Sequence, residues 1–140
     1  MVFEFPLRVR YMEVDAQGVV FNGWYLTYFD EAVSEFLRDT GAGYAEMKAL
    51  SLDFQLVHAE LDWKAGLRWR DEFTVAVSTA KVGQTSLTLD FEARRAGEVT
   101  CTARIVYVIV ATDGSGKRPV PPALRAALEA AIPPPVQHQR

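Results

Sequence analysis

The spacing of apolar side chains changes along the chain, and this change limits the folds that the chain can adopt. Residues 22–40 carry apolar side chains at the i, i+3 and i+4 spacings of an amphipathic helix. From residue 54 to 112 the spacing becomes two, which is typical of strands with one buried face. One long helix and several alternating strands bury their apolar faces most simply when a curved antiparallel sheet wraps the helix. The sequence therefore predicts an α+β fold of this kind.

Turn and cap residues bound the expected elements. A first strand is expected at 3–11, and Pro6 argues for an edge position because it lacks a backbone N–H. Asn22 is suited to the N-cap of the long helix, and Gly41 supplies its stop. A short helical turn is expected at 44–48. The later strands are expected at 54–63, 72–81, 85–94 and 101–112, joined as an antiparallel meander through turns at Gly66, Gly83 and Gly97.

The last part of the chain is expected to be less regular. A turn at 113–116 and the pair Pro121–Pro122 precede a short helix rich in alanine and leucine that ends near Ala131. The sequence shows no internal repeat and no linker between domains. We therefore expect one domain of the hotdog class over residues 1–132, followed by a flexible C-terminal tail at 133–140.

The composition of the chain indicates its cellular location and the kinds of partner that it can bind. Apolar residues make up 49% of the chain, yet no apolar run approaches the roughly 18 residues that cross a bilayer, so we expect no membrane insertion. The N-terminus lacks a signal-peptide pattern, and Cys101 alone cannot form an intrachain disulfide, which together favour a cytoplasmic location. A net charge of −3 gives no global positive field for nucleic acid. Local basic clusters, which could meet a small anionic ligand, occur at Lys64/Arg68/Arg70 and Arg94/Arg95.

Few side chains are placed to carry chemistry. His58, His138 and Cys101 show no metal-ligand spacing, so we expect neither a metal site nor a cofactor. Neither a nucleophile elbow nor a glycine-rich phosphate loop occurs. Asp15 lies in a loop before the long helix, and Gly18 lets the backbone there approach a ligand closely. The competing interpretation is a turn aspartate that only accepts hydrogen bonds from nearby backbone N–H groups.

The segment 8–26 resembles the N-terminal signature of the 4-hydroxybenzoyl-CoA thioesterase family, including its Tol-Pal-associated acyl-CoA thioesterases. The core of the match is Asp15-Ala16-Gln17-Gly18-Val19-Val20, followed by the aromatic Phe21. The resemblance covers residues 5–112. It implies a hotdog thioesterase domain that hydrolyses an acyl thioester of CoA or of an acyl carrier. It also implies a homodimer or homotetramer with the active site between two subunits.

The resemblance also implies roles for individual residues. The aspartate at the position of Asp15 attacks the thioester carbonyl or activates water, and sequence leaves the choice between these roles open. Backbone N–H groups at the helix start, around Asn22 and Gly23, polarise the carbonyl oxygen, in agreement with the partial positive charge at a helix N-terminus. The further residues expected near the substrate are Gly18, Val19 and Tyr25 in the loop, and Lys64, Arg94 and Arg95 at the CoA phosphates.

Two positions depart from the family pattern. Asn22 stands where relatives often have histidine or tyrosine, and Gly66 stands where proline is expected before the third strand. The turn at 82–85 lacks the basic run by which some relatives hold the CoA phosphates. Two alternatives therefore stay open: a hotdog protein that binds an acyl-CoA or acyl carrier without turnover, and a hydroxyacyl-thioester dehydratase. The dehydratase would need a histidine near the helix, and none occurs before His58.

Overall fold

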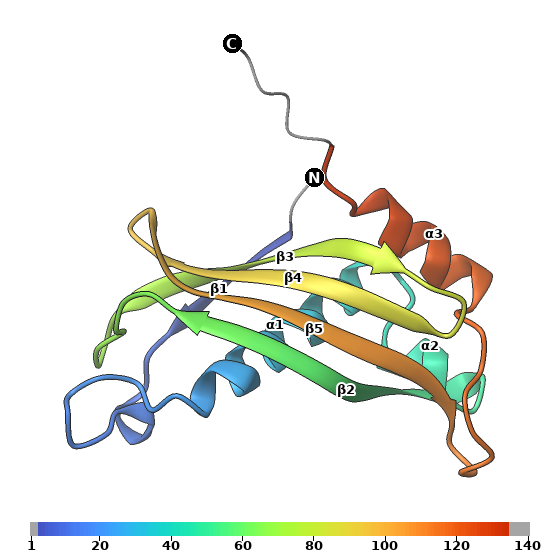
Figure 1. The fold of residues 1–140 in the computed structure, drawn as a ribbon, viewed down its shortest axis with the longest axis horizontal. Coiled ribbons are helices and arrows are strands. Elements are labelled where there is room, and N and C mark those ends of the chain that lie inside the picture. Colours follow the sequence, from blue (N-terminus) through green and yellow to red (C-terminus); the bar gives the residue numbers. More distant parts are fainter. Residues whose placement is uncertain (1–2, 135–140) are drawn as a thin grey trace.

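A five-stranded antiparallel sheet forms the frame of the molecule, and helices pack against it (Figure 1). The computed structural model describes residues 3–134. Its strands are β1 (Phe3–Arg8), β2 (Leu52–Trp63), β3 (Glu72–Val82), β4 (Ser86–Arg95) and β5 (Glu98–Ala111). Its helices are α1 (Trp24–Asp39), α2 (Tyr44–Ala49) and α3 (Pro122–Ala130), with a single 3-10 turn, η1 (Tyr11–Glu13).

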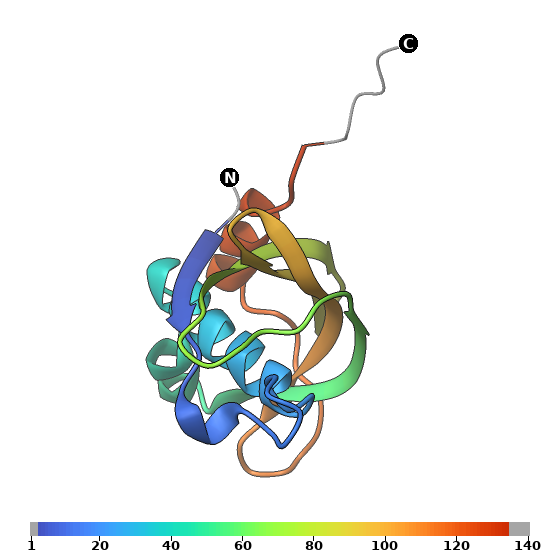
Figure 2. The ribbon, with the colours of Figure 1, turned by 90° about the vertical axis from the view of Figure 1, so that its left-hand side faces the viewer.

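The sheet curves, and α1 lies on its concave side (Figure 2). The side chains that α1 buries recur at helical spacing, as the sequence predicts: Tyr25, Tyr28, Phe29, Ala32, Val33, Phe36 and Leu37. They meet the inward residues of the strands; the rings of Phe29 and Phe91, for example, have centroids 5.0 Å apart. Removing each large apolar side chain from water contributes about 1.5–3 kcal/mol, so this layer is the main source of stability.

The order of strands in the sheet is β1-β3-β4-β5-β2. The meander prediction holds for β3, β4 and β5, but it is wrong for β2, which pairs with β5. Residues 64–71 instead carry the chain from β2 at one edge of the sheet to β3 near the other. Gly66 consequently lies in this crossover and not in a hairpin. Alternation of apolar residues predicts which face of a strand is buried, but it does not predict which strand lies beside it.

Several boundaries follow from single residues. β1 is an edge strand that pairs with β3, which confirms the interpretation of Pro6. Gly97 has φ +82° and follows Ala96 at φ +49°, so the β4–β5 connection is a two-residue turn of the kind that glycine favours. Gly41, with φ +74°, follows the end of α1 and confirms the predicted stop.

The predicted N-cap of the long helix, Asn22, is wrong by one residue. The first helical residue is Trp24, the N-cap position belongs to Gly23, and no side chain caps the helix there. Asn22 instead accepts a hydrogen bond through its backbone carbonyl, from Tyr25 N–H at 3.3 Å. The chain enters α1 through a tight turn in which backbone groups satisfy one another, so a side-chain cap is not needed.

The C-terminal helix forms where it is predicted. It begins at Pro122, whose fixed φ suits the first turn of a helix, and buries Leu124 and Leu128. Most of the predicted tail at 133–140 lies outside the described residues. None of the helices within residues 3–134 is long and apolar enough to cross a membrane.

Candidate functional site

The Asp15 loop is a closed hairpin-like turn. Val14 and Val20 form an isolated antiparallel bridge, and inside it Asp15 N–H donates to the Val19 carbonyl at 2.9 Å. Gly18 N–H donates to the Asp15 carbonyl at 3.0 Å, and Gly18 has φ +81°, which a residue with a side chain rarely adopts. These bonds fix the backbone on both sides of the Asp15 carboxylate.

The Asp15 side chain is partly exposed, and its two oxygens differ. Oδ1 accepts a hydrogen bond from Gln17 N–H at 2.8 Å, which is the turn role that competes with catalysis. Oδ2 makes no hydrogen bond to any other group in residues 3–134. One oxygen therefore orients the carboxylate, while the other is free to meet a carbonyl carbon or a water molecule.

The loop leads directly into the first turn of α1. Phe21 N–H donates to the Glu13 carbonyl at 2.9 Å, which holds the two arms of the loop together up to the helix. Trp24 N–H donates to the Phe21 carbonyl at 3.0 Å. The amides of Asn22 and Gly23 find no acceptor in the described part of the chain. These are the two amides that the resemblance assigns to the carbonyl oxygen.

Glu13 is a residue of this site that the sequence analysis missed. Its side chain is completely buried, and Oε1 accepts hydrogen bonds from Tyr28 Oη and from the Arg10 backbone N–H, each at 2.8 Å. Oε2 accepts from the Arg10 guanidinium at 2.7 and 2.9 Å. Glu13 thus ties the Asp15 loop to α1. The Arg10-x-x-Glu13 spacing was the available signal, because residues three apart meet within one helical turn.

Two tyrosines of α1 lie behind the loop. Tyr25, predicted to border the substrate, has its side chain in the core, where its ring meets Tyr28 and Trp63 edge-on at 5.8 and 6.3 Å. Burial raises the pKa of Tyr25 to about 12. Burial, and then the hydrogen bond to Glu13, raise the pKa of Tyr28 further. Both hydroxyls therefore stay protonated at neutral pH, and Tyr28 is a hydrogen-bond donor to Glu13.

The crossover at 64–71 packs on the other side of the Asp15 loop. Val20 N–H donates to the Leu67 carbonyl at 2.8 Å. A Cβ atom at Gly66 would lie 2.8 Å from Cγ1 and 3.3 Å from Cβ of Val19, so a residue with a side chain would force Val19 to shift. This contact gives a physical reason for glycine where the family pattern led us to expect proline. Val19 therefore faces the crossover, whereas Gly18 lies near the Arg68 side chain.

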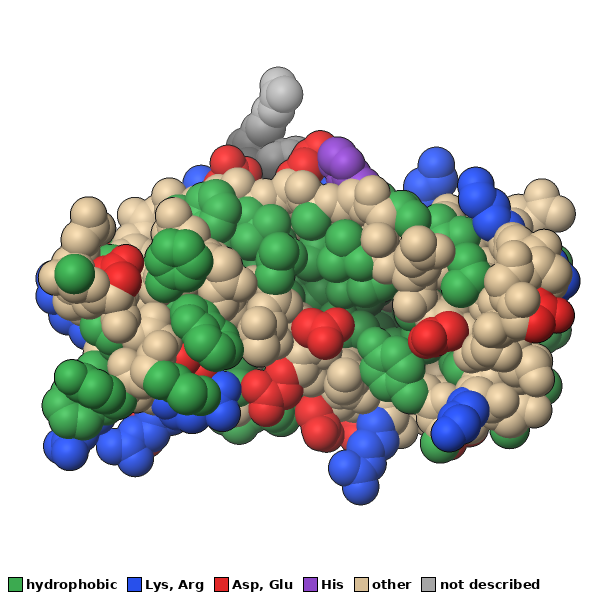
Figure 3. All heavy atoms as spheres, turned by 90° about the horizontal axis from the view of Figure 1, so that it is seen from below, with side chains coloured by type: hydrophobic (Ala, Val, Ile, Leu, Met, Phe, Trp, Pro, Cys, Tyr) green, Lys and Arg blue, Asp and Glu red, His purple; other side chains and the backbone are tan. Residues whose placement is uncertain are grey.

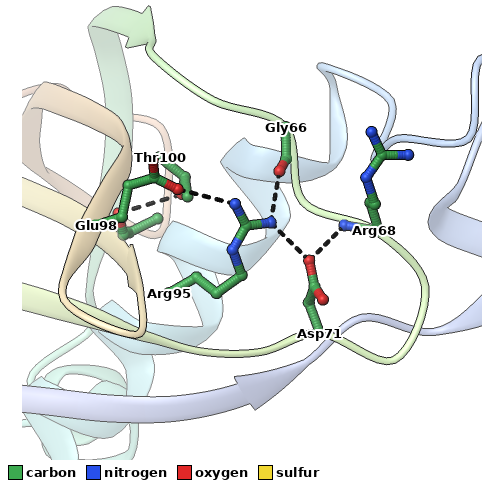
Figure 4. Close-up of polar contacts among 7 residues, drawn as sticks. Gly66, Arg68, Asp71, Arg95, Glu98 and Thr100 are labelled. Atoms are coloured by element: carbon green, nitrogen blue, oxygen red, sulfur yellow. Dashed lines mark hydrogen bonds and ion pairs between the residues drawn. The ribbon is translucent and has the colours of Figure 1, made fainter.

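Arg95 anchors the crossover to the sheet (Figure 4). Its Nη1 donates to the Gly66 carbonyl and to Oδ2 of Asp71, both at 2.8 Å, and its Nη2 donates to Glu98 at 2.9 Å. Asp71 also accepts from Arg68 N–H at 2.8 Å. Burial acts to raise the pKa of Asp71, but the Arg68 amide and the Arg95 guanidinium outweigh it and leave that pKa lowered from 3.8.

The three residues predicted to meet the CoA phosphates differ in whether a carboxylate already pairs with their side chains. Arg95 is engaged as described, and Arg94 pairs with Glu92 and, at 3.9 Å, with Glu4. Lys64 is exposed, and no carboxylate within residues 3–134 pairs with its ammonium group. In that part of the chain no three His, Cys, Asp or Glu side chains are grouped so that they could hold a metal ion.

A hollow apolar surface lies beside the site. Seen from below, hydrophobic side chains gather at the middle of this face, where the surface is hollowed (Figure 3). The edge strand β2 exposes three large apolar side chains, and α1 and α2 expose one each. We call this set the apolar face: Leu26, Tyr44, Leu56, Val57 and Trp63. Exposed apolar surface of this extent is typical of ligand-binding or subunit interfaces.

Comparison with known proteins identifies the family. Residues 9–128 match the Thioesterase-like superfamily. The chain belongs to this superfamily. The match spans the Asp15 loop, α1, all of β2 to β5 and most of α3. The five-stranded antiparallel sheet with few helices is accordingly a hotdog-like thioesterase fold.

Individual relatives agree with this assignment. The chain is 34% identical over 91 residues to a protein of Aquifex aeolicus named as an esterase, covering 65% of this chain and 71% of that protein. It is 27% identical to the acyl-CoA thioesterase YbgC of Haemophilus influenzae, over 84% of this chain and 86% of the relative. A solved structure of a hypothetical Aquifex aeolicus protein superposes with a TM-score of 0.84 at 28% identity, covering 90% of this chain and 98% of that one. At the level of family and named relatives, the expectation of a thioester hydrolase is confirmed.

Proposed function

We propose that this protein is an acyl-CoA thioesterase in which Asp15 is the catalytic carboxylate. The observation that carries the proposal is the geometry of the Asp15 loop in a member of the thioesterase-like superfamily. The loop holds one carboxylate oxygen by a backbone N–H and leaves the other free, next to the unused amides of Asn22 and Gly23. Relatives named as acyl-CoA thioesterases support the same reaction.

Two reaction routes fit this arrangement. As a nucleophile, the Asp15 oxygen adds to the thioester carbonyl, the carbon–sulfur bond breaks, and the CoA thiolate leaves; water then hydrolyses the mixed anhydride. As a general base, Asp15 takes a proton from water, the resulting hydroxide adds to the carbonyl, and the proton goes to the departing thiolate. Either route gives a carboxylic acid and free CoA, and both place negative charge on the carbonyl oxygen. The amides of Asn22 and Gly23 would stabilise that charge.

The proposal also covers the subfamily, the domain organisation, the cellular location and the oligomeric state. The sequence Asp15-x-x-Gly18-Val19-Val20 supports a place among the 4-hydroxybenzoyl-CoA thioesterase-like, Tol-Pal-associated enzymes. We assign residues 1–132 to one hotdog domain with α1 as its central helix. The lone, buried Cys101 is compatible with a cytoplasmic location. The exposed apolar face fits a homodimer or homotetramer, in which the substrate would lie between subunits.

A turnover screen tests the proposal. Purified protein is mixed with short-chain, long-chain and aromatic acyl-CoAs, and release of the free thiol is recorded. We expect hydrolysis of at least one class well above the rate without protein. Binding of acyl-CoAs without release of thiol from any of them would refute the hydrolase and favour the non-catalytic binding alternative. Loss of water from a hydroxyacyl-CoA, without thiol release, would favour a dehydratase.

A further inference from the structure

Two aromatic rings and two arginines form an exposed group beside the Asp15 loop. We call it the aromatic–arginine patch: Tyr11, Arg68, Trp69 and Arg70. Tyr11 is 74% exposed and Trp69 is 49% exposed, although such rings usually bury most of their surface. Figure 3 shows hydrophobic and basic side chains gathered together at the left end of the molecule, which is the end occupied by the loop and the crossover in Figure 1.

The members of the patch hold one another in place. The Tyr11 and Trp69 rings meet edge-on with centroids 5.3 Å apart, and the Arg70 guanidinium carbon lies 4.5 Å from the Trp69 ring centroid. Arg70 has φ +71°, a backbone conformation that side-chain-bearing residues rarely adopt and that tends to occur at functional sites. The patch is therefore a formed surface before any ligand arrives.

The two arginines of the patch have no carboxylate partner among the described residues. Within residues 3–134, neither the Arg68 nor the Arg70 guanidinium forms an ion pair. The arginines that do pair with a carboxylate in the same part of the chain are Arg10, Arg94, Arg95, Arg104 and Arg125. An unpaired guanidinium is well suited to a phosphate, which it can hold through two parallel hydrogen bonds.

The patch is joined to the proposed catalytic loop at two places. Tyr11 precedes Asp15 in the same loop, and Nη1 of Arg68 would lie 3.8 Å from a Cβ atom at Gly18. The bond from Val20 N–H to the Leu67 carbonyl fixes the crossover, which carries the other three members, against that loop. A ligand with its thioester at Asp15 and a flexible arm can therefore extend to the patch.

We propose that the aromatic–arginine patch binds the nucleotide end of coenzyme A. This inference rests on the proposed function, because a CoA thioester carries a purine ring and several phosphates at the other end of the flexible pantetheine arm from its scissile bond. Trp69 and Tyr11 offer aromatic surface on which a purine stacks, and Arg68 and Arg70 offer positive charge for the phosphates. An anionic membrane surface is the less suitable occupant, because the protein carries a net charge of −3.

The test compares two substrates with the same acyl group. One is the acyl-CoA that the screen identifies, and the other is the corresponding N-acetylcysteamine thioester, which lacks the nucleotide. Trp69→Ala and the double variant Arg68→Gln/Arg70→Asn should each raise KM for the acyl-CoA by about tenfold, with little change in kcat. Asparagine is chosen at position 70 because it tolerates positive φ better than glutamine. The kcat/KM for the short thioester should stay within about twofold, since loss of a stacking and phosphate contact does not affect it.

Two control variants accompany the test. Trp69→Phe keeps an aromatic face and should retain most of the affinity for the acyl-CoA. Arg38→Gln removes an exposed arginine at the far end of α1 and should leave KM unchanged. An unchanged KM for acyl-CoA in the patch variants would overturn the proposal. So would an equal loss on both substrates, because the patch would then act by supporting the Asp15 loop.

Direct binding separates this inference from the hydrolase proposal. If the parent protein hydrolyses neither substrate, the proposed function fails, and calorimetric titration with coenzyme A itself then decides the patch. Tighter binding of coenzyme A by the parent protein than by Trp69→Ala supports it; equal binding overturns it. Loss of binding to phosphatidylglycerol vesicles in the patch variants, with coenzyme A binding unchanged, would also overturn it and assign the patch to a membrane surface.

Discussion

At the scale of single residues, Asp15 and Asp113 form the same turn in different surroundings. Each carboxylate accepts a hydrogen bond from the N–H two residues ahead, at 2.8 Å in both cases. Only Asp15 lies in a loop that is held against the first turn of the long helix. The turn geometry therefore does not distinguish a structural from a catalytic aspartate, and the difference must come from the neighbouring groups.

Asp15→Asn should lower kcat for the best acyl-CoA by about 10²–10⁴-fold. The amide still accepts the Gln17 N–H, so the loop is preserved, but it can neither attack a carbonyl nor accept a proton. Steady-state thiol release, with melting temperature and oligomer mass checked in parallel, measures the effect. Asp113→Asn is the matched control and should keep the parent rate. Activity of Asp15→Asn within a few-fold of the parent would show that the carboxylate is dispensable.

Glu13 is expected to be important for stability as well as for the loop. Glu13→Gln removes the charge that receives three N–H donors from Arg10 and the Tyr28 hydroxyl, so the free energy of unfolding should fall by about 1–3 kcal/mol. Arg10 is 58% exposed and can be solvated, so the larger cost of a stranded buried charge is avoided. Urea titration measures the change. Tyr28→Phe, which removes one donor, should cost less; a larger loss in Tyr28→Phe than in Glu13→Gln would contradict this account.

At the scale of elements, the Arg95–Asp71 ion pair joins the crossover at 64–71 to β4, in addition to the backbone hydrogen bonds that the crossover makes. The pKa of Asp71 is lowered in the folded state, so its ionised form contributes to stability. That contribution is fully present above the ordinary value of 3.8 and is lost as the pH falls through the lower folded-state pKa. The stability of the crossover should therefore be insensitive to pH near neutrality and weaken in acid.

Asp71→Asn should be less stable than the parent at pH 7, and the difference should shrink as the pH falls below 3.8 and through the lower folded-state pKa of Asp71. Urea unfolding at a series of pH values measures both curves. Arg95→Gln tests the same contact from the other side and should also flatten the acid limb of the stability profile. A difference between parent and Asp71→Asn that is constant over this range would rule out a contribution from Asp71 ionisation.

At the scale of the whole molecule, β2 is an edge strand with a long free side. It spans 12 residues, pairs with β5, and exposes Leu56, Val57 and Trp63. A long edge with exposed apolar side chains associates readily, and a second copy of the chain is the simplest partner. The apolar face also includes Leu26, which is exposed in the first turn of α1.

The protein should therefore be a dimer or tetramer in solution. Light scattering after gel filtration should give a multiple of 15.6 kDa at micromolar concentration. Val57→Lys should shift the population toward monomer, since it places a charge in the middle of the exposed edge. If the site lies between subunits, activity should fall in parallel with the dissociation. A parent protein with the mass of a single chain would contradict the prediction.

Local patterns in the sequence were sufficient to locate the elements and to nominate a carboxylate. Apolar spacing is a local property, and it located α1, α2, α3 and the strands to within a few residues, because burial of one face requires it. Gly41, Gly97 and Pro6 specified a helix end, a hairpin and an edge strand through their backbone restrictions alone. The Asp15 motif was recognised from a resemblance, and it lies where the loop meets the long helix.

How these elements meet depends on tertiary contacts that local patterns do not record. The pairing of β2 with β5 depends on which edges are free once the sheet curves around α1, which no local pattern records. Contacts between segments distant in sequence also bury Glu13 and place Tyr25 in the core. The same kind of contact pairs Arg95 with Asp71. The aromatic–arginine patch likewise exists because the crossover brings Trp69 to Tyr11. The sequence gives the chemical type of each side chain, but whether that side chain is free to bind or react depends on the residues that the fold places around it.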